Sequence, residues 1–255
     1  MTRPGPTAWH RLNPLTKLTL ATVTSLVAVI WGGIVAPLGL LAVVVIAPAV
    51  LAGVLPRLIR TSLLLSLPIA ISAFVVNLFF FPGATDVLFA LGPIKATREG
   101  LAFALEILAR ILTISGSLTL FYLTTRPADL VLDLERRGVS PRIAFVINAS
   151  VQTVPRMVER AETIIAAQRA RGLDTEGSIW QRIRGVVPIV GPVIMSSIGE
   201  VEQRTMALEA RGFTRPGRRT LLWSPRDTGV ERLTRWLIVL AVPLVVIART
   251  NGWLG

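Results

Sequence analysis

The chain alternates between long apolar runs and short polar breaks, and five of the runs are long enough to cross a membrane. They cover residues 15–33, 35–55, 61–81, 100–124 and about 233–248. A helix needs about 20 apolar residues to cross the hydrocarbon core of a bilayer. The pattern therefore predicts an all-α, polytopic membrane protein with about five transmembrane helices.

The segment between the fourth and fifth runs has a different pattern. It combines many charges with apolar positions at helical spacing, which predicts a folded helical domain rather than a loop. Helices are expected at about 127–135, 141–170 and 178–210. The expected division of the chain is a four-helix transmembrane region, 1–124, a cytoplasmic helical domain, 125–232, and a final transmembrane helix, 233–255.

One stretch of this helical domain, GVVPIVGPVIMSSI at residues 185–198, is strongly apolar. It has only 14 residues and contains two prolines, so it is short and broken for a membrane span. We interpret it as an apolar face that lies on the membrane surface or packs against a partner below it. A sixth crossing is the alternative, and the basic residues on both sides of the stretch weigh against it.

Basic residues outnumber acidic ones by 27 to 15, and they gather at particular ends of the apolar runs. They include Arg3, Arg11 and Lys17 at the first run, Arg57 and Arg60 between the second and third, and many within residues 125–232. Because basic flanking residues are retained in the cytoplasm, the N-terminus and the helical domain are predicted to be cytoplasmic, in a multi-pass protein of the cell membrane. Arg249 at the outer end is the exception. Charges beside spans indicate contact with membrane lipid and not with nucleic acid.

Two of the predicted helices in the helical domain end in the same way. AETIIAAQRARG at 161–172 aligns with VEQRTMALEARG at 201–212 at a constant offset of 40 residues. Each glycine can adopt the left-handed conformation that closes a helix, and each arginine lies in the last turn, where the helix dipole favours positive charge. A single Arg-Gly end is an ordinary helix stop. Two equivalent ends suggest paired protrusions whose guanidinium groups bind carboxylates of a partner.

The paired Ala-Arg-Gly ends, together with NPLTKL at 13–18 and TTRPADLVLDLERRGVSPR at 124–142, resemble the transmembrane T component of energy-coupling factor (ECF) transporters. The resemblance covers almost the whole chain. It implies a non-catalytic subunit that transmits the movement of two ATP-binding cassette (ABC) ATPase subunits to a separate substrate-binding S component. The cargo of such transporters is a vitamin or a transition-metal ion such as cobalt or nickel.

Carried over by position, the residues that dock on the ATPases are Ala170, Arg171, Gly172, Ala210, Arg211 and Gly212. The resemblance also gives residues 185–198 and the small-residue surfaces of the spans as candidates for contact with the S component. Ser115, Gly116 and Ser117 form one such surface, and packing inside the subunit is the alternative for them. Gln152 departs from the family pattern, where an arginine is expected.

One ion pair is predicted inside the fourth run. Glu106 and Arg110 stand four residues apart, so they share a helix face and can neutralise each other. A lone charge at mid-membrane would cost at least about 2.5 kcal/mol, so a structural pair is favoured over a proton relay. The sequence has no cysteine, a single histidine and no phosphate-binding loop, so neither a metal site nor a cofactor is expected.

Two other functions remain open from the sequence. An integral membrane enzyme acting on lipid would use the basic cytoplasmic face to hold anionic headgroups, but it would need acids, His or Ser converging at one membrane depth. A conventional permease domain that binds substrate itself would need polar residues along several spans. Apart from the Glu106–Arg110 pair and Asn77, the runs offer few such residues.

Overall fold

The computed structural model describes residues 7, 9–81, 87–91, 94–172, 179–213, 215 and 227–252. The chain divides into two compact units. We call residues 1–133 and 224–255 the membrane unit, and residues 134–223 the paired-helix unit.

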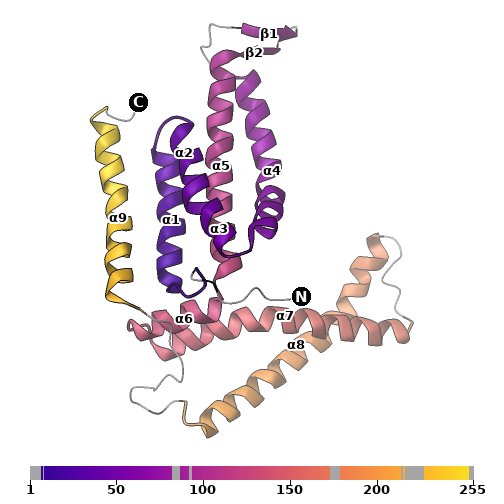
Figure 1. Ribbon diagram of the computed structural model, residues 1–255. Helices are drawn as coiled ribbons and strands as arrows, with labels where there is room; N and C mark the ends of the chain where they lie inside the picture. Colours follow the sequence, from indigo (N-terminus) through magenta and orange to yellow (C-terminus); the bar gives the residue numbers. More distant parts are fainter. Residues whose placement is uncertain are drawn as a thin grey trace. The chain divides into compact units, whose positions relative to one another are not determined.

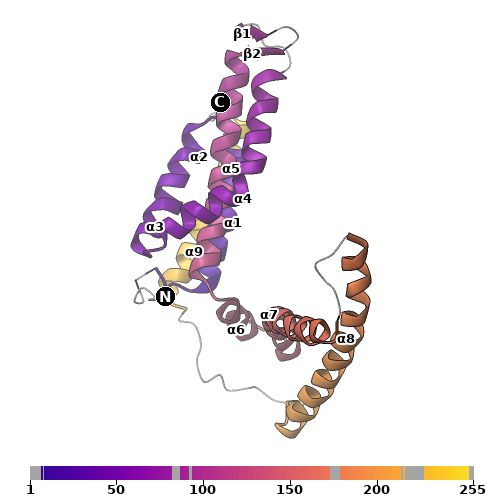
Figure 2. The same ribbon diagram turned by 90° about the vertical axis from the view of Figure 1, so that its right-hand side faces the viewer.

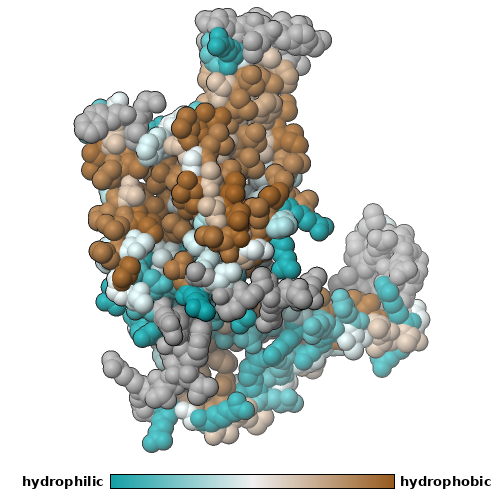
Figure 3. All heavy atoms as spheres, viewed as in Figure 1, coloured by the Kyte–Doolittle hydropathy of each residue, from teal (hydrophilic) through white to brown (hydrophobic). Residues whose placement is uncertain are grey.

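The membrane unit is a bundle of helices that run side by side (Figures 1 and 2). Its elements are α1 (Pro14–Ile30), α2 (Val35–Leu40), the π-helix η1 (Leu41–Ile46), α3 (Ala47–Leu51), α4 (Leu55–Phe79), α5 (Arg98–Thr124), most of α6 (Pro127–Arg136) and α9 (Gly229–Thr250). Within the described residues, α4, α5 and α9 are long and apolar enough to cross a membrane, and 14–30 and 35–51 are shorter apolar helices. The visible side of this bundle is apolar over most of its length (Figure 3). The predicted all-α membrane fold is confirmed.

Several predicted boundaries are wrong by a few residues, because turns follow local capping and not hydropathy. The second helix ends at Leu51, where Gly53 at φ 67° closes it and Val54 N donates to Ala49 O at 3.0 Å. Pro56 then lies in the first turn of α4 and does not end the preceding helix. In the same way, a capping box of Thr228 and Glu231 starts α9 earlier than the apolar run does.

A short hairpin joins α4 to α5, and the sequence analysis did not predict it. Strands β1 (Val87–Leu91) and β2 (Ile94–Thr97) pair antiparallel with a register irregularity between Val87 and Phe89. Thr97 then caps α5, because its side chain accepts a hydrogen bond from Gly100 N at 3.2 Å. In its described part, the segment between α4 and α5 is therefore ordered by the backbone hydrogen bonds that pair β1 with β2.

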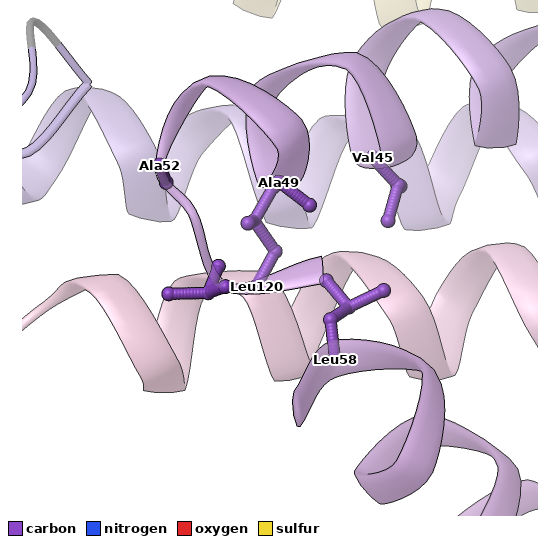
Figure 4. Packing of buried hydrophobic residues seen from close by; sticks show 6 residues of the cluster. Val45, Ala49, Ala52, Leu58 and Leu120 are labelled. Carbon is purple, nitrogen blue, oxygen red and sulfur yellow. The ribbon is translucent and has the colours of Figure 1, made fainter. Parts of the chain in front are cut away.

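The core of the membrane unit lies where η1 and α3 pack against α4 and α5. Figure 4 shows Val45, Ala49 and Ala52 facing Leu58 of α4 and Leu120 of α5. Small and medium side chains dominate this cluster, as expected where helices associate in lipid by close packing.

The small residues in the middle of α5 are used inside this unit. A Cβ added to Gly116 would lie 3.0 Å from Val45 Cγ1, Ser115 Oγ donates to Ser62 O at 3.1 Å, and Ser117 Oγ lies 3.0 Å from Ser25 Oγ. Internal packing, the alternative given for this surface in the sequence analysis, is therefore what the fold shows.

The paired-helix unit consists of the end of α6 and two long helices, α7 (Pro141–Ala170) and α8 (Ile179–Ala210), which cross each other. Their bounds agree with the predicted 141–170 and 178–210. Pro188 and Pro192 lie inside α8, and its ribbon bends between its two halves (Figures 1 and 2).

Candidate functional site: two arginine-bearing helix ends

The two Ala-Arg-Gly segments close α7 and α8 with the conformation expected for a glycine stop. Gly172 has φ 90° and its N–H donates to Arg169 O at 2.9 Å. Gly212 has φ 67°, its N–H donates to Glu209 O at 2.9 Å, and Phe213 N donates to Leu208 O at 2.9 Å. These bonds use the last carbonyl groups of each helix, and because both glycines have a left-handed φ, a residue with a Cβ could replace either one only with strain. We call Ala170–Gly172 the first end and Ala210–Gly212 the second end.

Both ends are exposed. Ala170, Arg171 and Gly172 are all open to solvent, and so are the three equivalent residues of the second end. A Cβ placed on either glycine meets no atom within 4 Å. A partner surface can therefore approach each arginine and the backbone of the glycine that follows it.

Closure alone does not distinguish these ends from an ordinary helix stop. α6 ends in the same way at Arg137-Gly138, with φ 111° at the glycine and Val139 N donating to Leu134 O at 3.1 Å. What sets the first and second ends apart is their arrangement on a pair of helices.

An ion-pair cluster joins α7 to α8. Arg160 Nη1 lies 2.9 Å from Glu200 Oε2, and Arg204 Nη2 lies 2.7 Å from Glu200 Oε1. Arg160 stands eleven residues before Arg171, and Glu200 stands eleven residues before Arg211. At 1.5 Å of rise per residue, each arginine lies about 16 Å along its helix from this shared point.

The two helices are antiparallel, so the ends point away from each other. Phe145 of α7 packs on Phe213 with ring centroids 5.0 Å apart, and Gln168 Nε2 donates to Pro188 O at 3.5 Å. Contacts thus pair the start of α7 with the end of α8. Figure 1 shows the C-terminal ends of α7 and α8 on opposite sides of the crossing. The arginines are separated by at most about 33 Å along the helix pair.

The contact of Gln168 with Pro188 has a local cause. Pro192 has no N–H, so the carbonyl of Pro188 lacks its donor within α8. The Gln168 amide supplies a hydrogen bond to that carbonyl. The kink of α8 is thereby connected to the last turn of α7.

Both helices of this unit carry exposed apolar side chains at helical spacing. On α7 they are Ile143, Val146, Ile147, Val151, Val154, Met157 and Val158. On α8 they include Val190, Ile194, Met195, Ile198 and Val201. Part of the second set falls in the predicted apolar stretch 185–198, of which the side chains of 185–187 lie outside the described residues. α8 is not among the described helices that could span a membrane.

The predicted pair Glu106–Arg110 forms, and it fastens α5 to the turn after α1. Glu106 Oε1 accepts from Arg110 and from Gly33 N, the latter at 2.9 Å. Arg110 Nη2 also donates to Trp31 O at 3.3 Å. These contacts support the structural interpretation of the pair.

Arg249, the basic residue that does not fit the charge rule, has a contact at the same turn. Its guanidinium donates to Ile30 O at the C-terminal end of α1. Arginines of α5 and α9 thus bind the last carbonyl groups of α1, where the helix dipole is negative.

At its other end, α1 is held by a buried polar network that the sequence analysis did not predict. Arg235 of α9 donates to Asp227 Oδ1 at 2.6 Å, to Asn13 Oδ1 at 3.2 Å and to Thr16 Oγ1 at 3.2 Å. Asn13 N donates to Glu231 Oε1 at 3.2 Å. The signal available in the sequence is Arg235 itself, a charge inside an apolar run.

Lys17 of the NPLTKL segment belongs to the same end of α1. Its Nζ donates to Thr124 O at 3.0 Å, where α5 ends, and to His10 O at 3.4 Å. Burial and the charge of Lys17 lower the pKa of the His10 imidazole, which is therefore neutral at pH 7. NPLTKL thus joins α1 to the last turns of α5 and to α9.

An apolar pocket of about 530 Å³ lies between α1 and the helix that follows it. It is lined by Val27, Trp31, Gly32, Gly33, Val35, Ala36, Gly39, Leu40, Val43 and Val44. Such a lining gives few groups that could bind a polar substrate. The part of the chain that the structure describes also holds no group of three or more His, Asp or Glu that could bind a metal ion.

Taken together, the apolar bundle and the exposed, crossed helix pair define a multi-pass helical membrane protein that carries a separate paired-helix unit. A family model described as Cobalt transport protein (CbiQ) matches residues 6–221, and the chain belongs to this family. It is a membrane subunit of an ECF transporter complex.

Curated relatives agree with this assignment over most of their length. The Energy-coupling factor transporter transmembrane protein EcfT of Streptococcus equi is 31% identical over 258 residues, covering 96% of this chain and 91% of the relative. Proteins of the same name from Thermosediminibacter oceani and Bacillus subtilis are 28% and 27% identical, and each alignment covers 89% of this chain and 88% or 90% of the relative.

Proposed function

We propose that this chain is the non-catalytic coupling subunit of its transporter, and that Arg171 and Arg211 each dock into a groove of one of two ABC ATPase domains. The observation that carries the proposal is the equal placement of two exposed Ala-Arg-Gly ends about a shared ion-pair cluster. A planar guanidinium at a helix tip suits a bidentate contact with a carboxylate. The small alanine before each arginine leaves room for a close approach.

Movement of the ATPases then passes through α7 and α8. When two domains close on ATP, the docked ends move with them, and the contacts between the helices transmit the movement. The exposed apolar side chains of α7 and α8 are the surface for the S component, which selects a vitamin or a transition-metal ion. The N-terminus and the paired-helix unit lie in the cytoplasm, and the membrane is the cell membrane.

The alternatives from the sequence have less support. A permease domain would require polar groups around a substrate, whereas the 530 Å³ pocket is lined by apolar residues and glycines. A lipid-acting enzyme would require acids or nucleophiles that converge, whereas the buried charges described above bind backbone groups, one another, and the side chains of Asn13 and Thr16.

The test compares the complexes purified from membranes that contain wild-type chain, Arg171→Ala, Arg211→Ala or the double variant. Truncating one partner of a buried charge pair at an interface costs about 2–5 kcal/mol, so each single variant should hold ATPases more than about tenfold more weakly. The double variant should lose both the ATPases and ATP-driven uptake.

Arg137→Ala is the matched control, because Arg137 precedes the glycine of a third, similarly closed helix end. It should bind ATPases and support uptake like wild type. Normal binding and uptake by the double variant would show that the two arginines are only helix ends and would refute the proposal.

A further inference from the structure

The pocket between α1 and the helix that follows it is a hollow lined in part by very small residues. They are Gly32, Gly33, Ala36 and Gly39. A Cβ added to Gly33 or Gly39 would meet no atom within 4 Å, so the space beside these glycines is open. The pocket volume of about 530 Å³ lies in the range of about 300–1,000 Å³ that is common for sites of small ligands.

Packing on α5 holds the wall of this pocket in place. Thr113 Oγ1 of α5 donates to Pro37 O at 2.8 Å, and a Cβ added to Gly116 of α5 would lie 3.0 Å from Val45 Cγ1. α2 and η1 therefore use one face to pack on α5. On another face, Val35 and Val43 line the pocket and are exposed, so the pocket is open at this edge.

The lining of the pocket favours hydrocarbon over water. An apolar cavity that offers few hydrogen-bonding groups stays dry, and its side chains lose dispersion contacts when nothing fills it. The helices that form the walls belong to the apolar bundle that lies in the membrane. The hydrocarbon that surrounds such a bundle is the acyl chains of the lipids.

Arginine side chains lie at one end of the pocket, beside the lining residue Trp31. Arg110 donates to Trp31 O, and its charge is matched by Glu106. Arg249 donates to Ile30 O, is exposed, and forms no ion pair with a carboxylate of the described residues. A guanidinium has five N–H groups, so Arg249 keeps donors for a further acceptor. Phosphate suits the planar fork of a guanidinium, and tryptophan is common at the level of the lipid headgroups.

We propose that this pocket holds an acyl chain of an anionic phospholipid whose phosphate is bound by Arg249. The apolar lining alone does not select a headgroup, because every phospholipid offers similar chains. The charge of Arg249 does, since it favours a lipid with net negative charge over phosphatidylcholine, whose choline cation compensates the phosphate. The proposal does not depend on the docking of Arg171 and Arg211.

The expected selectivity follows from a single uncompensated arginine. One arginine near a membrane surface favours anionic lipid by about fivefold. The negative C-terminal ends of α1 and α9 offset part of this charge. We therefore expect phosphatidylglycerol to bind about threefold more tightly than phosphatidylcholine.

The experiment uses Trp31 as a reporter, because it lines the pocket. The full chain with Trp31 as its only tryptophan, the other five being replaced by phenylalanine, is placed in phosphatidylcholine vesicles. A rising fraction of the lipid is brominated phosphatidylglycerol or, in a second series, brominated phosphatidylcholine. Brominated chains quench tryptophan fluorescence on contact, so the two series give the relative affinity of the two lipids.

A second reporter gives the reference for ordinary membrane lipid. Trp236 is 64% exposed on α9 and lies about 20 Å along this helix from Arg249. The affinity ratio should be about three at Trp31 and about one at Trp236. A ratio of one at both positions would overturn the proposal. If neither lipid quenches Trp31, a protein surface covers the pocket, and the proposal is likewise wrong.

Three variants then test the two parts of the site separately. Arg249→Gln should lower the ratio at Trp31 to about one, whereas Arg249→Lys keeps the charge and should keep most of the preference. Gly39→Leu fills the pocket from a position where a Cβ meets no atom, and it should reduce quenching of Trp31 by both lipids.

Gly199→Leu is the matched control for the filled pocket. Gly199 is also a helical glycine whose added Cβ would meet no atom within 4 Å, and it lies on α8, in the other unit. It should leave the quenching of Trp31 unchanged. An unchanged ratio in Arg249→Gln would refute the phosphate contact, and unchanged quenching in Gly39→Leu would refute the pocket as the site of the chain.

Discussion

The membrane unit buries several of its charges, whereas the paired-helix unit exposes its charges and much of its apolar surface. Lys17 and Arg235 are 4% and 8% exposed, and both are hydrogen-bonded to neighbouring helices or turns. Of the described residues of the paired-helix unit, only Ala144 is buried. Its ion-pair cluster, around Glu200, is about one third exposed.

The difference shows which part of the subunit is complete by itself. The membrane unit hydrogen-bonds its buried Lys17 and Arg235 within itself, as a structure surrounded by lipid must. The paired-helix unit has little interior, so its apolar side chains and its two ends are available to other proteins. Stability should therefore depend on buried charges in the first unit, and partner binding on exposed groups in the second.

The largest effect should come from the network at the start of α9. Arg235→Met removes the buried guanidinium that donates to Asp227 and Asn13, and breaking a buried ion pair costs about 3–5 kcal/mol. Thermal unfolding of the detergent-solubilised protein should show a strongly lowered midpoint.

Arg232 gives a matched control for this prediction. It faces the same Asp227 at 3.9 Å but its side chain is 67% exposed, so Arg232→Met should cost less than about 1 kcal/mol. Equal destabilisation by the two variants would contradict the distinction between buried and exposed charge.

A smaller loss is expected from the pair inside α5. Arg110→Leu removes the donor to Trp31 O and leaves Glu106 with Gly33 N, at a cost of about 2–3 kcal/mol. Glu106→Gln combined with Arg110→Leu should cost less than the sum of the two single changes, because no unpaired charge remains. Additive losses in a double-mutant cycle would show that the two side chains act separately.

The hydrophobic pattern predicted the helices well, because each membrane helix must be apolar over most of its length. It did not predict the turns at Gly53 and Thr228, which depend on local hydrogen bonds. The Glu106–Arg110 pair was predictable because both partners stand on one helix. The contacts of Arg235 with Asn13 and Thr16 were not, because they join residues more than 200 positions apart in the chain.

The candidate site, too, could be predicted from the sequence only in part. The glycine closures follow from sequence, since a left-handed residue at a helix stop favours glycine. That both arginines stand eleven residues from the Arg160–Glu200 ion pair required knowledge of how α7 pairs with α8. Docking by these arginines stays a prediction.

The smallest effect on stability is expected from the exposed cluster that joins α7 and α8. Arg160→Ala should cost less than about 1 kcal/mol and leave the unfolding midpoint of the membrane unit unchanged. It should instead broaden the distribution of distances between spin labels at Ala167→Cys and Ala207→Cys, because a restraint between the helices is lost. Arg142→Ala, at the exposed start of α7, is the control and should leave the distribution unchanged.

Charge exchange sharpens this last prediction. Arg160→Glu with Glu200→Arg keeps opposite charges on the two helices and should restore a narrow distribution, although Arg204 then faces a positive neighbour. If the distribution stays narrow in Arg160→Ala as well, the helices are held by the Phe145–Phe213 and Gln168–Pro188 contacts. The contact of Gln168 with Pro188, at the kink of α8, would then transmit movement from one helix to the other.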